Sequence, residues 1–267
     1  MLWRKYAKHR SIRRAIMLLG IVRPRTKNKS SEFSNCPGCN ANLFGQGPAI
    51  SGQLASEWGL NPIELQLLER QQGFYCQNCG CNLRSMTLME SILEHFNFNG
   101  SFADFVISKH TKRLKVLEMN EAGGLNKYLN HIPGHLLASY PSVDLQNLPY
   151  DERSFDVIIH SDTLEHVPNP KKALSECRRV LKKDGACFYT IPILIDRRTR
   201  NRIGEINSYH GIPLDCANPS EHPNRYLVHQ EYGCDAWTEA LEAGFSKVSI
   251  FSIEYPASLS LICSGFR

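Results

Sequence analysis

Short apolar runs alternate with helical stripes over the second half of the chain. Residues 115–119, 136–138, 155–160 and 186–191 have the length and composition of buried strands. Between and after them, apolar residues recur at helical spacing over 125–129, 173–181 and 236–241. This alternation predicts a mostly parallel sheet with helices on both faces. Residues 245–253 and 258–264 read as two strands whose link is too short for a parallel crossover, so the sheet should end in an antiparallel hairpin.

The first half of the chain shows two helical patterns. Asn61 can cap a helix that starts at Pro62, and Glu64 can reach back to the cap. Further on, Met89 begins a stripe of apolar residues at helical spacing that includes Ile92 and Phe96. The second helix is expected to bridge to the sheet domain.

Charge is unevenly distributed. Of the 31 Lys and Arg residues, ten lie between Met1 and Lys29, where there is no Asp or Glu. A helix there would be basic and amphipathic, suited to anionic lipid or nucleic acid. A solvated terminus or an organelle transit peptide would have the same composition. The rest of the chain is mildly acidic, and the 42% of hydrophobic residues excludes global disorder.

We therefore predict four regions: a basic arm (1–30), a cysteine module (31–85), a helical linker (86–113) and the sheet domain (114–267). The longest apolar run, residues 15–22, is shorter than the ~20 residues of a membrane span, so no transmembrane segment is expected. Peripheral membrane contact through the arm stays open. The ten cysteines are not arranged as in a secreted disulfide scaffold, which predicts a reduced, cytoplasmic compartment.

Two Cys-x-x-Cys pairs predict a metal site. Cys36/Cys39 and Cys76/Cys79 each place two thiols on one tight turn, where Gly38 and Gly80 let the backbone wrap around an ion. Four sulfurs are the ligand set of structural zinc. The 36 residues between the pairs leave room for the helix that Asn61 caps. Cys81 is an alternative ligand. A redox pair or two disulfides are the other interpretations.

A second set of motifs spans Leu114 to Leu181. It includes Val116-Leu-Glu-Met-Asn-Glu-Ala-Gly-Gly124, Asp144-Leu-Gln-Asn-Leu-Pro149, Ser161-Asp-Thr-Leu-Glu-His166 and Arg178-Arg-Val-Leu-Lys-Lys-Asp-Gly185. In these residues the chain resembles class I S-adenosylmethionine-dependent methyltransferases, in particular the methyltransferase type 11 group. The resemblance covers about Leu114 to Arg267. It implies a Rossmann-like sheet that binds its ligand at the carboxyl ends of the strands.

The resemblance also implies a set of S-adenosylmethionine-binding residues. Glu118 would face the cationic end of the cofactor, and Asp144 would accept a hydrogen bond from the adenine amino group. The glycines after the first strand would let the backbone approach the cofactor, although Asn120 stands where the family usually has Gly. The residues predicted to bind the cofactor are Glu118, Asn120, Gly123, Gly124, Ser139, Tyr140, Asp144, Leu145, Ser161 and Asp162.

The chain departs from the family pattern after its second strand. No acid follows Ala138 to grip the ribose hydroxyls, so Ser139 or Tyr140 would have to substitute. The connection from Tyr140 to Asp144 is too short for the usual helix and strand. The fold is therefore predicted to be a trimmed methyltransferase sheet.

Histidines mark the remaining candidates. His166 could act as a general base, or order its loop or the methionine end of the cofactor. The polar segment 196–232 is expected to cover the pocket mouth, either as a solvated lid or to recognise an anionic or hydroxylated acceptor. Its residues His210, Cys216, His222 and His229 are an irregularly spaced alternative metal set.

Together these patterns predict a methyltransferase that uses S-adenosylmethionine and Zn²⁺. The expected acceptor is an oxygen or nitrogen of a saccharide or other small metabolite. RNA is an alternative acceptor through the basic arm, and a non-catalytic zinc-containing binding protein is an alternative of another class. Oligomeric state is not predicted.

Overall fold

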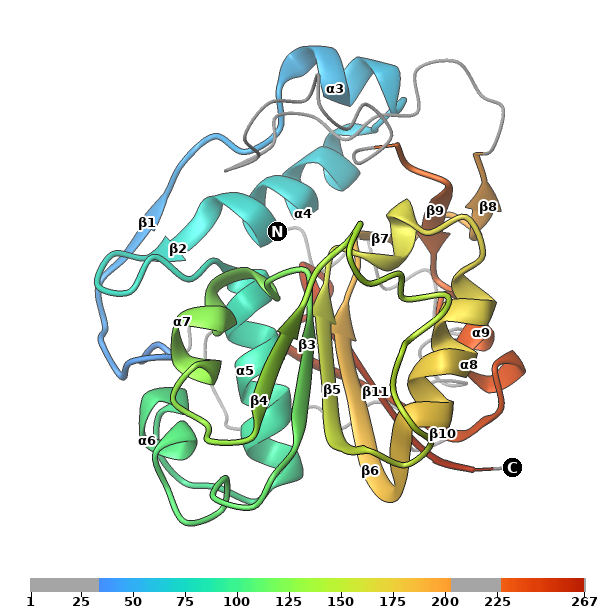
Figure 1. Cartoon of the computed structure of the whole chain (residues 1–267). Helices are drawn as coiled ribbons and strands as arrows, with labels where there is room; N and C mark the ends of the chain where they lie inside the picture. The colour runs from blue at the N-terminus through green and yellow to red at the C-terminus, as the bar shows by residue number, and fades with distance from the viewer. Residues whose placement is uncertain (1–33, 203–226, 267) are drawn as a thin grey trace.

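The computed structural model describes residues 34–202 and 227–266 (Figure 1). Its central sheet is made of β3 (Val116–Met119), β4 (His135–Ala138), β5 (Phe155–Ser161), β6 (Leu181–Thr190), β10 (Phe245–Glu254) and β11 (Ser258–Phe266). The strand order is β10-β11-β6-β5-β3-β4. The four strands β4, β3, β5 and β6 pair in parallel, and β11 pairs antiparallel with both β6 and β10.

The predicted α/β fold with an antiparallel terminal hairpin is therefore confirmed. The trimming is confirmed as well, because within the described residues no strand or helix lies between β4 and β5. A loop of 16 residues, 139–154, makes this connection instead. β4 is the last strand on its side of the sheet, and its Leu136 and Leu137 are partly exposed.

Helices cover both faces, as the alternation predicts (Figure 1). One core lies under α8 (Pro170–Val180) and α9 (Thr238–Glu242), and the other under α5 (Leu83–His95), α6 (Phe102–Val106) and α7 (Asn126–Leu129). Alternate residues of β5 enter the two cores: Ile158 faces α8, while Val157 and Ile159 face α5. Burial of both faces is why these strands read as continuous apolar runs.

The cysteine module is built from β1 (Phe44–Gln46), α3 (Gly52–Glu57), α4 (Pro62–Gly73) and β2 (Phe74–Cys76). β1 and β2 pair antiparallel. The predicted capping box is present, because Asn61 accepts from the Glu64 N–H and the Glu64 carboxylate accepts from the Asn61 N–H. α5 begins seven residues after β2 and packs across the sheet, so the predicted boundary at residue 85 falls inside α5.

The described ends of the predicted lid form a small sheet beside the module. β7 (Ile193–Leu194), β9 (Gln230–Gly233) and β8 (Arg200–Asn201) have the order β7-β9-β8. Two predictions lie outside the described residues: the basic arm with its lipid or RNA contacts, and the metal set that includes His210, Cys216 and His222. Within residues 34–202 and 227–266, every helix is too short or too polar to cross a lipid bilayer.

Candidate functional site

Four cysteines from two separate turns meet at one point. Sγ of Cys36 lies 3.6 Å from Sγ of Cys79, and Sγ of Cys39 lies 3.7 Å from Sγ of Cys76. All four sulfurs lie within 4.8 Å of one another. A tetrahedral ion with Zn–S bonds of about 2.3 Å sets its sulfurs about 3.8 Å apart, whereas a disulfide needs about 2.05 Å. The spacing fits a metal tetrahedron.

The two turns have the same backbone pattern. In each, the residue after the second cysteine donates its N–H to the carbonyl of the first cysteine, 2.8 Å away, and has positive φ: Asn40 at 62° and Gly80 at 72°. In the first turn this position is thus held by Asn40, a residue type that tolerates positive φ, and not by Gly38, which was expected to let the backbone wrap around an ion. Gly38 instead makes room for a neighbour, since a Cβ there would lie 3.1 Å from Sδ of Met89.

Polar groups surround the sulfurs. The Asn78 side-chain amide donates to Sγ of Cys39 at 3.3 Å, and the Lys127 ammonium donates to the carbonyl oxygen of Cys79. Such donors stabilise negative charge on thiolates and orient the ligands of a metal. Cys81, the alternative ligand, is outside the group of four, and its thiol donates to the Gly124 carbonyl at 3.6 Å.

Glu118 organises the loop at the carboxyl end of β3. Its side chain is fully buried, and it accepts from the Ala122 N–H at 2.7 Å, the Asn126 amide at 2.9 Å and His135 Nε2 at 2.7 Å. Both carboxylate oxygens are thus engaged inside the domain. Glu118 shapes the loop on which a cofactor would rest, and its direct contact with a cofactor stays a prediction.

Asn120 occupies a left-handed position in this loop, with φ of 57°. Asn tolerates this conformation better than other residues with a Cβ, which explains how it replaces the family's Gly. Its side-chain oxygen accepts from the Tyr140 N–H at 2.8 Å, so the loops after β3 and β4 are tied together. The Tyr140 side chain is 48% exposed and Ser139 is half-buried, consistent with a surface that receives a ligand.

The two glycines of the loop make room for the cysteine module. A Cβ at Gly123 would lie 2.7 Å from Oγ of Ser85, and one at Gly124 would lie 2.6 Å from Sγ of Cys81. The Gly124 N–H donates to Oγ of Ser85 at 3.1 Å. Gly123 is exposed on its other side. The structure shows that the glycines allow the close approach of Cys81 and of Ser85 in α5, and the predicted approach of a cofactor stays a prediction.

Asp144 starts a turn in the long loop before β5. Its carboxylate accepts from the Gln146 N–H at 2.8 Å, and its carbonyl accepts from the Asn147 N–H at 2.9 Å. The Leu145 side chain is buried in the core, so only its backbone can reach a ligand. Asp144 remains partly exposed beside it.

The carboxyl end of β5 carries a charged cluster. The Ser161 hydroxyl bonds to Oγ1 of Thr190 at 2.7 Å, and Asp162 follows with φ of 45°. The Asp162 carboxylate forms an ion pair with Arg84 of α5 and accepts from the Gln72 amide of α4 at 3.2 Å. Burial lowers the pKa of Arg84 to about 10, while Glu165 acts in the opposite direction. Arg84 therefore keeps its charge at neutral pH.

His166 lies just beyond this cluster in a short 3₁₀ turn (Leu164–His166). Its Nδ1 lies 3.0 Å from the Leu227 carbonyl oxygen, and its Nε2 lies 3.9 Å from Oε1 of Glu165. A carbonyl oxygen only accepts, so Nδ1 carries the proton in this bond. When the ring is neutral, this tautomer leaves Nε2 without a proton, which is the form that a general base requires.

A second buried cluster lies deeper in the domain. His160 lies within 4.8 Å of the sulfurs of Cys177 and Cys187, measured between ligand atoms, and its ring stacks on that of Tyr189. Burial lowers the pKa of His160 to about 4, with Glu165 opposing the shift, so the ring is neutral at pH 7. All three residues are buried on β5, β6 and α8.

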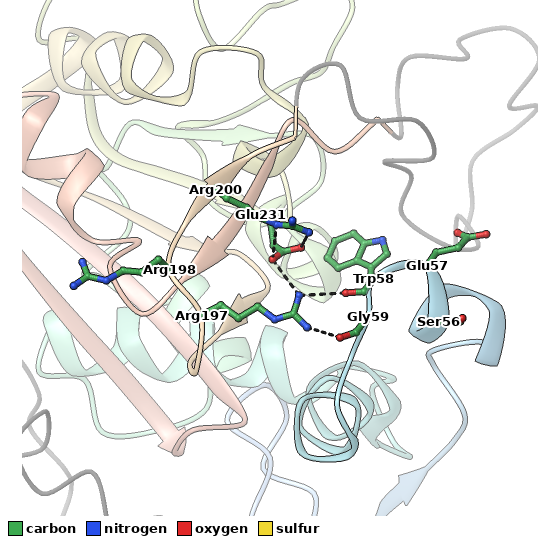
Figure 2. Close-up of a pocket in the computed structure, with 8 residues that line it drawn as sticks. All are labelled: Ser56, Glu57, Trp58, Gly59, Arg197, Arg198, Arg200 and Glu231. Carbon is green, nitrogen blue, oxygen red and sulfur yellow. Dashed lines mark hydrogen bonds and ion pairs between the residues drawn. The ribbon is translucent and has the colours of Figure 1, made fainter.

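A groove separates the α3–α4 turn from the lid strands (Figure 2). It is lined by Ser56, Glu57, Trp58, Gly59, Arg197, Arg198, Arg200 and Glu231. Arg197 crosses from the lid to the module, where its guanidinium donates to Glu64 at 2.7 Å and to the carbonyls of Trp58 and Gly59. Glu231 accepts from Arg197, Arg200 and Arg202. Arg197 thus joins the lid ends to the module, while Arg200 and Arg202 bind Glu231 within the lid ends.

The Glu64–Arg197 pair predicts a pH dependence of stability. Burial by itself raises the pKa of Glu64, but hydrogen bonds from Arg197 and the Asn61 N–H outweigh burial and hold the pKa below its usual value of 4.5. The pair therefore stabilises the fold above about pH 4.5, and this contribution is lost as pH falls through the folded-state pKa. We expect Glu64→Gln to lower the free energy of unfolding at pH 7 by about 1–3 kcal/mol.

Urea unfolding at pH 7 and pH 4 checks this, because the variant should differ less from the wild type at pH 4. Glu242→Gln is the matched control, since Glu242 pairs with Lys171 at 3.4 Å with both side chains more than half exposed. The control should change stability by less than about 0.5 kcal/mol at either pH. An equal loss from both variants would contradict the prediction.

Arg84, Gln72 and Arg197 were not among the predicted site residues. Arg84 carried a detectable signal, because it is the only charged residue between Arg70 and Glu90 and opens a helix of apolar residues. A lone charge in such a stretch indicates a buried partner. The partner, Asp162, lies 78 positions away and is brought near only by folding.

The central part of this site matches a known protein family. Residues 124–189 match the model of a methyltransferase domain. The match begins at Gly124 and includes Asp144, Ser161, Asp162 and His166. It bears out the resemblance to class I S-adenosylmethionine-dependent methyltransferases for these residues, whereas the cysteine module lies outside it.

Curated relatives agree with this assignment. The ubiquinone biosynthesis O-methyltransferase of Coxiella burnetii is 24% identical over 135 residues, which cover 49% of this chain and 50% of the relative. A probable S-adenosylmethionine-dependent methyltransferase of Mycolicibacterium smegmatis is 30% identical over 92 residues, 33% of this chain and 35% of the relative. The chain thus spans about half or less of the length of these relatives.

Some solved structures have similar descriptions, at low sequence identity and low TM-score. A S-adenosylmethionine-dependent methyltransferase of Thermotoga maritima, described as a possible histamine N-methyltransferase, is 15% identical with a TM-score of 0.36. That overlap covers 67% of this chain and 94% of the other. The assignment of the methyltransferase domain rests on the sequence matches.

Proposed function

We propose that the protein is a S-adenosylmethionine-dependent methyltransferase that acts on an oxygen or nitrogen of a saccharide or other small metabolite. The observation that supports it best is the arrangement at the carboxyl edge of β3 and β5. There the loop of Asn120 to Gly124 follows β3, and Asp162 follows β5. The two strands are adjacent and parallel, with Glu118 paired to Ile159 and Met119 to His160. Ligands of doubly wound sheets bind at this edge.

Different residues of the chain would bind the cofactor and accept the proton. Bound S-adenosylmethionine supplies a methyl group that is electrophilic because it is attached to a sulfonium. The loops after β3 and β4, tied through Asn120 and Tyr140, would hold the nucleoside, and Asp144 would accept from the adenine amino group. His166 would receive the acceptor's proton on Nε2, since Nδ1 is held by the Leu227 carbonyl. The remaining rate enhancement would come from holding the acceptor atom in line with the methyl group.

We assign the cysteine tetrad to structural zinc. Four sulfurs from two turns leave no ligand position for water, which is the arrangement of a structural site and not of a catalytic one. The sulfur distances of 3.6 and 3.7 Å support the assignment. The ion would fix the module, including α5, against the methyltransferase domain.

A small acceptor is favoured over RNA by charge. Outside residues 1–30 the acidic residues outnumber the basic ones, which does not suit an extended RNA surface. RNA remains the competing acceptor because of the basic arm. Retention of the protein on RNA that falls with salt and disappears when residues 1–30 are deleted would favour RNA over a saccharide.

Cofactor binding tests the proposal directly. Calorimetry should show that the purified protein binds S-adenosylmethionine or S-adenosylhomocysteine. We expect Asp144→Ala to weaken binding about 10- to 100-fold, the worth of a hydrogen bond to a charged group. Asp144→Asn is the matched control for the turn, because its side-chain oxygen can still accept from the Gln146 N–H. Failure of the wild type to bind either ligand would refute the proposed function.

A second candidate is a non-catalytic binding protein on the same scaffold. Two observations favour it: Glu118 is fully occupied inside the domain, and no acid follows β4 to hold a ribose. Mass spectrometry of ligands that co-purify with the protein separates the candidates. S-adenosylhomocysteine in the preparation would favour the enzyme, and a different small molecule would favour the binding protein.

A further inference from the structure

The cysteine module and the cofactor loop are joined by a short stretch of chain. Cys79, a member of the tetrad, is followed after one residue by Cys81, whose thiol donates to the Gly124 carbonyl. Ser85, in the first turn of α5, accepts from the Gly124 N–H at 3.1 Å. Only five residues thus separate the predicted metal ligand Cys79 from Ser85, a side chain that contacts the cofactor loop. Arg84 lies between these two contacts.

Arg84 is held at the carboxyl edge of the sheet. Its side chain is only 12% exposed, and it forms an ion pair with Asp162, whose own side chain is 22% exposed. A Cβ on Gly123 would lie 3.5 Å from the Arg84 guanidinium and 3.9 Å from Oγ of Ser161. The guanidinium therefore lies between the loop after β3 and the end of β5, where the methyltransferase domain would bind its cofactor.

This ion pair leaves polar atoms unused. Nε of Arg84 and Oδ1 of Asp162 are both buried and have no hydrogen-bond partner among the described residues. A buried donor or acceptor without a partner is costly, and native proteins avoid it unless a ligand or water completes the bond. The unused pair is one cationic donor and one anionic acceptor side by side. The complementary ligand is a zwitterion: a carboxylate for Arg84 and an ammonium for Asp162.

We propose that Arg84 binds the α-carboxylate of the methionyl end of S-adenosylmethionine, beside Asp162, which receives its ammonium. The proposal rests on the proposed function. It adds a cofactor-binding residue that belongs to the cysteine module and lies outside the region that matches the methyltransferase family. A planar guanidinium suits a carboxylate because two parallel N–H groups can meet its two oxygens. The tight turn that holds Cys76 and Cys79, here called the knuckle, fixes where α5 begins and hence where Arg84 lies.

The test compares two ligands that differ by the carboxylate. Calorimetry measures the binding of S-adenosylmethionine and of decarboxylated S-adenosylmethionine to the full chain and to Arg84→Gln. We expect the variant to bind S-adenosylmethionine about 10- to 100-fold more weakly and to bind the decarboxylated form within about threefold of the wild type. Arg70→Gln is the matched control, because Arg70 lies in the same module and pairs with Glu254. It should leave both affinities unchanged.

Other outcomes overturn the proposal. An equal loss for both ligands would show that Arg84 is only structural, and no loss for either would show that it does not reach the ligand. Should Arg84→Gln fail to fold, Arg84→Lys keeps the charge without the planar fork, and it should lose affinity only for the ligand with the carboxylate. A wild type that binds neither ligand would instead refute the proposed function, so the two failures are distinguishable.

Discussion

Cys76→Ser is expected to release the metal and to remove cofactor binding together. Purified wild-type protein should hold one zinc ion per chain, since four sulfurs lie within 4.8 Å of one another. Structural zinc contributes about 10–16 kcal/mol of binding free energy in small modules, so loss of one ligand should unfold the knuckle. The melting temperature should fall by more than about 5 °C, which corresponds to more than about 2 kcal/mol for a chain of this size.

The cofactor should be lost because the knuckle supports the loop after β3. Gly124 receives a hydrogen bond from the Cys81 thiol and gives one to Ser85, so unfolding of the knuckle removes both contacts. Metal analysis and calorimetry on the same preparation measure the two effects. Cys234→Ser is the matched control, because Cys234 is exposed and outside the tetrad. A Cys76→Ser protein that keeps its full zinc content would contradict the assignment of the ligands.

Glu118→Ala is expected to be the most destabilising single change at the site. The carboxylate is fully buried and serves three donors, two of them side chains from Asn126 and His135. Removing it leaves these donors without an acceptor and opens a cavity, at a cost of about 3–5 kcal/mol. Urea unfolding measures the loss of stability. Calorimetry should also show weaker cofactor binding, because the loop of Ala122 loses its anchor.

Glu118→Gln separates the two causes. The amide keeps the volume and one acceptor oxygen, so the Ala122 N–H or the Asn126 amide can still be served, and neutral His135 can present an acceptor to the new amide N–H. We expect a loss of about 1–2 kcal/mol, well below that of the alanine variant. Equal losses from both variants would show that charge, and not the number of hydrogen bonds, is what the site requires.

Much of the architecture could be predicted from local patterns. The strand at Phe155, the helix at Ala173 and the capped helix at Pro62 were each predicted from a few neighbouring residues, and all three are present. Burial on both faces makes the strands apolar throughout, and capping residues act within a single turn, so both leave a local signal. The missing helix and strand after Tyr140 were predicted from the length of the connection alone.

The roles of single residues were predicted less well. Gly38 was expected to let the backbone of the first cysteine turn wrap around an ion; the structure places the positive φ of that turn at Asn40, and Gly38 makes room for Met89. Glu118 was expected to face the cofactor, which stays a prediction, and no pattern in the sequence indicated that its carboxylate also accepts from the Ala122 N–H inside the domain. Both cases depend on which neighbours fill the space around a residue, and those neighbours come from distant parts of the chain.

The sequence by itself determined the cysteine pairs, the alternating strands and helices, and the residues shared with a methyltransferase domain. These features depend on spacing along the chain, which short stretches preserve. Only the tertiary structure decided that the helix after the second cysteine pair covers the sheet and brings Arg84 to Asp162, and that Arg197 ties the lid to Glu64. Such pairings join residues far apart in sequence, and their partners are set by how the layers pack once the two cores are buried.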